Sequence, residues 1–403
     1  MKYDTIITIV LFVFLLFILY FKRNKLQLQK IVYPILYMFI YRTEYGLKLM
    51  DRAAKRFPRI LDVISIIGIF VGFAGMVFIA FSLFQNFVMM FIKPSAQAGV
   101  ALVLPVKVPG AIHVPVLYWI ISIIVLAIVH EFAHGVMTRL YKVKVKSSGF
   151  AVFSLLVPLI PAAFVEPDEK ALSKKSAKEQ LGIFAAGPFA NVVLAFVCLG
   201  ILILGIMPLA GSLVYEDGVA VISAVPGMPA ENASITDDDV IVMMDETLIT
   251  NVSDFINYMN LSIPGQTVLV KTRKDSDLNT EETLHSVMLS NHPDNNSVAY
   301  IGLQVSPHSG IRPEIRDSIG WVIPRIAIWF VGLFYWLFLL NLGIGLFNLV
   351  PLGPLDGGRM MNVVLLRYFK KERAVKIFKY VSILFLAVIV IPLLYGFIKN
   401  GFL

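Results

Sequence analysis

The sequence predicts a polytopic α-helical membrane protein with about six transmembrane helices, re-entrant or β-structured segments, and one small extramembrane α+β domain. Three observations lead to this fold class. Hydrophobic residues make up 58% of the chain and charged residues only 15%, several apolar stretches are long enough to cross a bilayer, and one acidic stretch interrupts them. A soluble domain carries more charge than this, so we expect the chain to be integral to a membrane.

Six apolar stretches are predicted to span the bilayer, because each holds at least the roughly 17 residues that a helical crossing requires. They cover residues 5–21, 60–84, 114–141, 176–209, 320–350 and 378–398. Two further apolar segments, 96–115 and 147–163, contain prolines that disfavour a regular helix. We expect both to re-enter the membrane, the first as an extended hairpin. Residues 31–41 are expected to lie in the membrane interface.

Charge is distributed unevenly, and its distribution predicts the topology. Residues 212–318 include 16 acidic and 5 basic residues, whereas the rest of the chain has a net charge of +19. Basic residues beside spans stay in the cytoplasm, so we expect the N-terminus and the acidic domain outside and the loops after spans one, three and five inside. The pattern indicates the lipid bilayer, not a nucleic acid, as partner. The lack of a targeting peptide favours a prokaryotic cell membrane.

The third predicted span contains His130-Glu131-Phe132-Ala133-His134. Two histidines four residues apart face the same side of a helix, where both can bind one zinc ion. Glu131 is the residue type that can take a proton from a zinc-activated water. The basic residues that close the span begin about 13 Å along the helix from His130. Ionisable groups at such depth are costly, so this helix is a candidate functional site.

A third zinc ligand is expected from the end of the fifth span. The chain has one cysteine, Cys198, so the donors must be histidine and carboxylate and not thiolates. Pro351 and Pro354 break the helix, and irregular backbone at this depth is tolerated only inside protein or beside a wet cavity. Asp356 lies on this segment. Alone it would be interpreted as a helix cap, but beside two histidines it is expected to complete a site for one zinc ion per chain.

The acidic stretch contains a separate pattern. Strands are predicted at 219–225 and 267–272, and a short amphipathic helix at 251–259. The order of Pro-Gly-Met-Pro-Ala at 226–230, Asp-Val-Ile at 239–241 and Pro-Gly at 264–265 resembles a PDZ domain. Asp238 stands where that family usually has glycine, and there is no Gly-Leu-Gly-Phe loop. Capture of a peptide C-terminus is therefore left open, as is strand addition by an extended peptide segment.

These patterns divide the chain into four predicted parts. Residues 1–59 form an N-terminal span and basic segment, 60–211 the first half of a membrane core, 212–307 the PDZ-like domain, and 308–403 the second half of the core.

Three motifs, in this order, resemble the site-2 protease family of intramembrane metalloproteases. They are His-Glu-x-x-His in an early span, Gly-Pro-x-x-Asn at 187–191, and Asn-x-x-Pro-x-x-x-Leu-Asp-Gly at 348–357. The resemblance implies that His130, His134 and Asp356 bind zinc and that Glu131 is the catalytic acid and base. Asn348 and Asn191 match family positions near the active site, where they would steady an oxyanion or tie helices together. Helix packing is the expected role of Asn191.

The resemblance implies a zinc metalloprotease that hydrolyses peptide bonds in or near the transmembrane segments of other membrane proteins. Its site would lie toward the cytoplasmic side, and the PDZ-like domain would filter or dock substrates. Another membrane zinc protease, such as the prenyl-protein type, is one alternative, but that family requires a downstream glutamate as a zinc ligand. A membrane-anchored PDZ-like binding protein or a metal carrier without hydrolysis is the other. A carrier does not need Glu131 beside its ligands.

Overall fold

The computed structural model describes residues 26–32, 36–44, 46–92, 101–106, 108, 111–155, 157–237, 239–274, 282–293 and 295–399, together with Val10, Val13, Phe17 and Phe21. These residues belong to two compact units, one formed by Met1–Ile203 and Gly332–Leu403 and the other by Leu204–Val331. Apart from four positions, the first predicted span lies outside the described residues. The four sequence-based domain limits stay a prediction.

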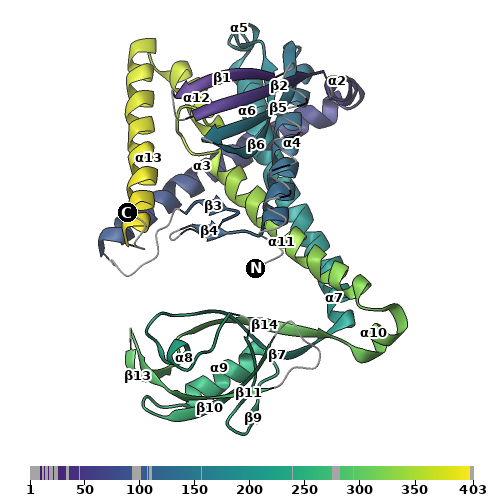
Figure 1. Ribbon diagram of the computed structural model, residues 1–403. Helices are drawn as coiled ribbons and strands as arrows, with labels where there is room; N and C mark the ends of the chain where they lie inside the picture. The colour runs from purple at the N-terminus through teal and green to yellow at the C-terminus, as the bar shows by residue number, and fades with distance from the viewer. Residues whose placement is uncertain are drawn as a thin grey trace. The chain divides into compact units, whose positions relative to one another are not determined.

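Five helices in the described part of the chain are long and apolar enough to cross a membrane. They are α3 (Pro58–Ile92), α4 (Val116–Leu140), α6 (Ala177–Ile201) with its continuation through the π-helical turn η2 (Leu202–Ile206) and α7 (Met207–Leu213), α11 (Val322–Phe347) and α13 (Lys371–Lys399) (Figure 1). They coincide with the second to sixth predicted spans. The protein is an integral membrane protein, and the predicted fold class is confirmed.

Helix α6 is central to the membrane unit. It packs against α3, α4 and α12 (Asp356–Tyr368), while α2 (Leu47–Arg56) packs on α4. A buried apolar cluster joins these helices, with Met137 from α4, Ile183 and Phe184 from α6, and Met360 from α12. Close van der Waals packing of these side chains fixes how α4, α6 and α12 lie against one another. This packing brings the start of α12 next to the middle of α4.

A four-stranded antiparallel sheet completes the membrane unit. Its order is β1 (Leu26–Val32), β2 (Leu36–Thr43), β5 (Val145–Leu155) and β6 (Val157–Pro167). The predicted interfacial segment 31–41 and the predicted re-entrant segment 147–163 are therefore parts of one sheet. Strand β6 forms an edge and packs against α4. Pro161 and Pro167 are compatible with an edge strand, because a missing N–H costs no ladder hydrogen bond on the free side.

The segment expected as an extended hairpin at 96–115 differs from the prediction. Its described residues include two short strands, β3 (Val103–Leu104) and β4 (Ile112–His113), which pair in parallel, whereas a hairpin is antiparallel. The amides of Ile112 and Val114 donate to the carbonyls of Leu102 and Leu104 at 2.7 and 3.0 Å. The chain therefore returns to the N-terminal end of β3 before β4 pairs with it. The two described strands therefore do not form the expected hairpin.

The second unit is rich in β-structure and contains residues 212–307, the stretch that was predicted to be PDZ-like. One sheet has the order β11-β10-β8-β7-β14, with β9 paired to β8, and a second sheet pairs β12 with β13. The bounds are β7 (Val214–Ala224), α8 (Pro229–Asn232), β8 (Asp239–Met244), β9 (Thr247–Leu248), α9 (Val252–Leu261), β10 (Thr267–Lys274), β11 (Thr283–Met288), β12 (Ser290–His292), β13 (Asn295–Tyr300), β14 (Leu303–Ile311) and α10 (Pro313–Ile319). The predicted strands and helix fall on β7, β10 and α9. Asp238 lies outside the described residues.

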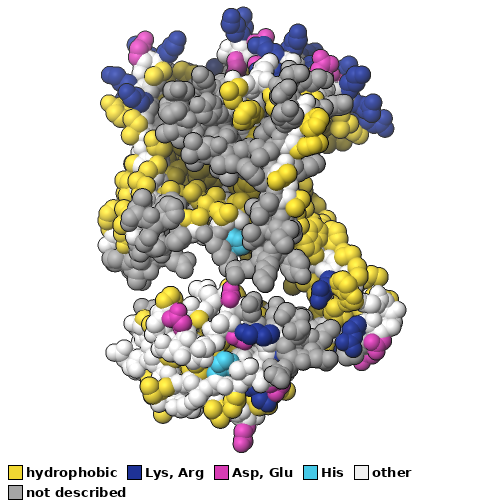
Figure 2. Space-filling model, in the orientation of Figure 1, with side chains coloured by type: hydrophobic (Ala, Val, Ile, Leu, Met, Phe, Trp, Pro, Cys, Tyr) yellow, Lys and Arg dark blue, Asp and Glu magenta, His cyan; other side chains and the backbone are white. Residues whose placement is uncertain are grey.

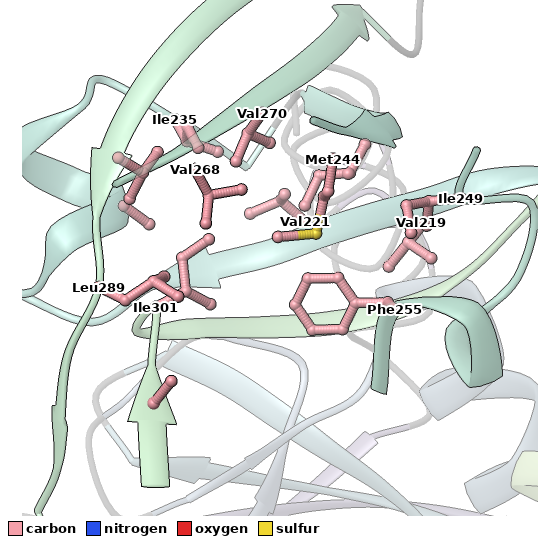
Figure 3. Close-up of a cluster of buried hydrophobic side chains, with 14 residues drawn as sticks. Val219, Val221, Ile235, Met244, Ile249, Phe255, Val268, Val270, Leu289 and Ile301 are labelled. Atoms are coloured by element: carbon pink, nitrogen blue, oxygen red, sulfur yellow. The ribbon is translucent and has the colours of Figure 1, made fainter. Parts of the chain in front are cut away.

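A large apolar cluster forms the core between the strands and α9 of this unit. Val268 and Val270 are fully buried on one face of β10, and Leu269 between them is exposed, as expected for a strand with one face in a core. The ring of Phe255 from α9 packs into the same cluster (Figure 3). Asn251 caps α9 by accepting the amide of Asp254 at 3.0 Å, and Asp254 in turn accepts the amide of Asn251.

Lys and Arg side chains gather at one end of the membrane unit, the end at which α2 and α5 (Glu169–Leu172) lie, and hydrophobic side chains cover the described helices below it (Figures 1 and 2). A sharp boundary between basic and apolar surface is typical of a protein whose helices cross a bilayer and whose basic end meets the headgroups.

Candidate active site

Three side chains from two distant segments meet inside the membrane unit. Helix α4 continues without interruption through His130 and His134, so both imidazoles lie on one face, with their Nε2 atoms 3.1 Å apart. Asp356 Oδ2 lies 3.1 Å from His130 Nε2 and 3.3 Å from His134 Nε2. The structure thus brings together all three ligands that the sequence predicted, although Asp356 is 222 residues from His134.

The spacing of these three atoms fits a metal ion. Ligand atoms around a tetrahedral zinc ion, with bonds of about 2.0–2.1 Å, lie about 3.3–3.4 Å apart. The observed triangle has sides of 3.1–3.3 Å. Two imidazoles and one carboxylate form a donor set typical of catalytic zinc. His130, His134 and Asp356 are therefore a candidate metal site.

Asp356 owes its position to a tight fold in the backbone. Helix α11 ends at Phe347 and α12 begins at Asp356, and the amide of Gly357 donates to the carbonyl of Asn348 at 2.8 Å, which closes the loop between them. A Cβ atom on Gly357 would lie 2.0 Å from the carbonyl oxygen of Leu349. Only glycine lets the chain approach itself so closely here, so the glycine of the Leu-Asp-Gly sequence is a steric requirement.

Helix α6 approaches the histidines equally closely. A Cβ atom on Gly187 would lie 2.3 Å from His134 Nε2 and 2.7 Å from His130 Nε2. One turn earlier, the carbonyl of Ile183 accepts a hydrogen bond from His134 Nδ1 at 2.7 Å. A protonated Nδ1 leaves Nε2 unprotonated and directed at the triangle, as a metal ligand must be. The motif at 187–191 was noted in the sequence, but the contacts of Ile183 and Gly187 were not foreseen.

Glu131 lies in a cavity of about 480 Å³ that the three candidate ligands also line. Its carboxylate oxygen Oε2 accepts a hydrogen bond from the backbone amide of Val165 on β6 at 2.9 Å. This bond fixes the direction of the carboxylate and connects it to the edge strand. The sequence offered no signal for the Val165 contact, because a backbone amide carries no residue signature.

The two asparagines take different places. Asn348 lines the cavity beside Asp356. Asn191 is completely buried, and its side-chain nitrogen lies 3.2 Å from His130 Nδ1, on the side of the ring away from the triangle. Asn191 is not among the described residues that line the cavity.

Arg359 is a cavity residue that the sequence interpretation missed as part of the site. Its guanidinium group lies 4.2 Å from the ring centroid of Phe184 and 2.7 Å from Glu169 Oε1. The spacing of three residues from Asp356 on one helix could have indicated it, because such residues share a face. Stacked guanidinium groups are favourable next to aromatic rings, so Arg359 ties α12 to α6 and α5 beside the cavity.

A hydrogen bond and an ion pair connect the C-terminal end of β6 to the neighbouring strands of its sheet. Glu166 accepts a hydrogen bond from Ser147 Oγ at 2.8 Å and pairs with Arg42 of β2. These hydrogen bonds from Ser147 and Arg42 hold the pKa of the Glu166 carboxyl below its ordinary value. The carboxylate form of Glu166 therefore helps to keep β6 in place beside Glu131.

A helical membrane unit that holds two histidines, an aspartate and a glutamate around one internal cavity has the make-up of an intramembrane metalloprotease. Residues 118–391, more than half of the chain, match the model of Peptidase family M50. The chain belongs to this family of metalloproteases, the site-2 protease family, and the resemblance stated from the motifs is confirmed.

Individual proteins are also similar to the chain. An uncharacterized protein from Methanocaldococcus jannaschii is 27% identical over 327 residues, covering 80% of this chain and 76% of that protein. The PDZ domain of an SdrC-like protein from Listeria monocytogenes is 24% identical, covering 22% of this chain and 87% of that structure, with a TM-score of 0.19. Its counterpart from Listeria innocua is 26% identical, covering 23% and 97%, with a TM-score of 0.20.

Proposed function

We propose that the protein is an intramembrane zinc protease that hydrolyses peptide bonds in or near transmembrane segments of other membrane proteins. The observation that supports this most strongly is the triangle of His130, His134 and Asp356 atoms with Glu131 in the same cavity. One zinc ion per chain is the proposed cofactor. When bound, such an ion supplies the Lewis acidity that polarises a peptide carbonyl and acidifies a water molecule.

Glu131 is proposed as the group that moves the proton. Its carboxylate accepts the proton of the attacking water and then delivers it to the nitrogen of the leaving amine, which releases the peptide fragment. The amide of Val165 holds one carboxylate oxygen, and the other remains available for the transfer. General acid–base catalysis of this kind contributes about 10²–10⁴ in rate.

Asn348 is proposed to steady the oxyanion that develops on the scissile carbonyl, because it lines the same cavity as Asp356 and Glu131. Removal of one such donor costs about 10²–10³ in kcat. Asn348→Ala should lower kcat by this amount at unchanged zinc content. If zinc content and stability fall instead, Asn348 only ties the helices together.

The free edge of β6 is proposed to hold the substrate in an extended form. A helical substrate hides its carbonyls in internal hydrogen bonds, so it must unwind before it is cut. Val165 directs its N–H toward Glu131, away from β5, and alternate residues of a strand address the same edge. Ala163 therefore presents its N–H and C=O to that edge, and Pro161, Ala163 and Val165 all line the cavity. An extended peptide paired there would lie beside the metal site.

The PDZ-like region is proposed to act before cleavage, by excluding substrates with bulky outer domains or by docking a trimmed peptide end. We place it outside a prokaryotic cell membrane and the protease site toward the cytoplasm. Two observations support this: the acidic residues concentrated in 212–318, and the basic side chains gathered at one end of the membrane unit (Figure 2). Cytoplasmic ends of spans carry the Lys and Arg excess.

Removal of the metal tests the proposal directly. Purified full-length protein in detergent should cut a model transmembrane substrate, lose this activity with a strong chelator, and regain it when zinc is added back. Activity that persists after the bound metal has been removed, as measured by elemental analysis, would exclude the zinc mechanism.

A further inference from the structure

The side-chain amide of Asn191 is buried, and only its nitrogen has a hydrogen-bond partner among the described residues. It is fully buried between α6 and α4, and its Nδ2 lies 3.2 Å from His130 Nδ1. Its Oδ1 has no hydrogen-bond partner among the residues that the structure describes. A buried amide oxygen without a donor is costly, so the orientation of this amide is open to question.

Only one of the two orientations of the Asn191 amide leaves His130 Nε2 free to bind a metal ion. If Nδ2 faces the ring, it donates to Nδ1, and the ring proton must then sit on Nε2, the atom that faces His134 and Asp356. A protonated Nε2 of a neutral imidazole cannot bind a metal ion. If the amide is turned by 180°, Oδ1 accepts a hydrogen bond from Nδ1–H and Nε2 is free. The turn loses no described hydrogen bond, because Oδ1 accepts none in the first orientation.

The second histidine follows the same rule. His134 Nδ1 donates to the carbonyl of Ile183 at 2.7 Å, which leaves its Nε2 free for the triangle. Ile183, Gly187 and Asn191 are spaced four residues apart, so they lie along one face of α6. On this face, the carbonyl of Ile183 accepts the hydrogen bond of His134, and Gly187 leaves space for both imidazoles. With its amide turned, Asn191 would offer an acceptor to His130.

We propose that Asn191 is a positioning residue whose side-chain oxygen accepts the Nδ1–H bond of His130 and thereby directs Nε2 toward the metal. This inference rests on the proposed zinc site. It replaces the expected role of Asn191 in general helix packing, and it excludes contact with substrate because the side chain is fully buried. Outer partners of metal-binding histidines set ring orientation and basicity, and their loss weakens metal affinity about 10–100-fold.

The test is the zinc dissociation constant of full-length protein in detergent, measured by competition with a chelator. Asn191→Leu keeps the approximate size of the side chain and removes the acceptor, so the dissociation constant should rise about 10–100-fold. Asn191→Asp keeps an acceptor oxygen, so its affinity should remain within a few-fold of wild type. Asn191→Ala, which adds no bulk, repeats the acceptor-loss measurement if the leucine variant is not recovered folded.

Asn341 provides a matched control. It is a fully buried asparagine in α11 whose Nδ2 donates to the carbonyl of Leu337 at 2.7 Å. Asn341→Leu should leave zinc affinity unchanged. The inference is overturned if Asn191→Leu or Asn191→Ala binds zinc like wild type. It is also overturned if Asn191→Asp or Asn341→Leu weakens binding as much, since packing would then be the cause. A wild-type protein that binds no zinc would instead contradict the proposed function.

Discussion

Gly187 shows how strongly single residues constrain the candidate metal site. The position is occupied by the residue with no side chain, and the nearest atoms to a hypothetical Cβ belong to the two histidines. Gly357 plays the same part for Asp356, where the close neighbours are backbone carbonyls. At this scale the site consists of its ligands together with the glycines that let three segments approach one another.

Gly187→Ala should therefore displace the imidazoles and abolish zinc binding, because its Cβ would stand 2.3 Å from His134 Nε2. Gly200→Ala is the matched control in the same helix, since no atom lies within 4 Å of its Cβ position. Alanine is favoured over glycine in helices by about 1 kcal/mol, so the control should fold at least as well as wild type. Zinc content of the two purified variants is the measurement, and equal content would contradict the close approach of α6.

A second residue-scale prediction concerns acid stability. Asp217 of β7 lies 2.6 Å from His308 Nδ1 and pairs with Arg273. Burial alone would raise the pKa of Asp217, but the hydrogen bonds from His308 and Arg273 outweigh it and hold the pKa below its ordinary value. A carboxyl group of this kind stabilises the fold above its unfolded pKa of about 3.9, and this contribution is lost as pH falls through the lower, folded value.

Asp217→Asn should consequently lower the melting temperature of the full-length protein near about pH 7, and the difference from wild type should shrink as pH falls below about 4. Thermal unfolding followed by circular dichroism across this range measures the effect. A melting-temperature difference of the same size at both ends of this pH range would show that the charge of Asp217 does not stabilise the fold.

At the scale of elements, the sequence predicted what depends on local pattern and missed what depends on distant pairing. Helices α3, α4 and α11 follow from uninterrupted apolar length, and the two histidines could be paired because one helix carries both. The sheet could not be predicted, because β2 and β5 are joined only through contacts such as Ile40 opposite Ala151, which lie far apart in the chain. The long apolar run of β5 and β6 fits a buried helix or a strand equally well.

The element that carries the substrate prediction is β6. Ala163→Pro removes the N–H that faces the free edge without removing a pairing bond to β5, so cleavage should be lost while zinc content stays at the wild-type level. Ala163→Ser keeps the N–H and should retain cleavage. Unchanged activity in the proline variant would show that substrates do not pair with this edge.

For the whole molecule, we expect the membrane unit to cleave substrates and the PDZ-like region to select them. If the region excludes substrates with bulky outer domains, deleting residues 212–307 should make untrimmed membrane substrates susceptible to cleavage in cells. Already trimmed substrates should be cut at the wild-type rate, because the metal site and β6 belong to the membrane unit. Continued resistance of intact substrates in a folded, active deletion variant would mean that the region does not filter them.

We propose that this cavity uses a metal and a carboxylate to hydrolyse peptide bonds. The most direct measurement pairs zinc content with cleavage of a model transmembrane substrate, for wild type and for Glu131→Gln, in detergent. We expect one zinc per chain in both proteins and cleavage by wild type alone, because the amide of the variant cannot take up the proton of the attacking water. Equal cleavage by both proteins, or no zinc in either, would contradict it.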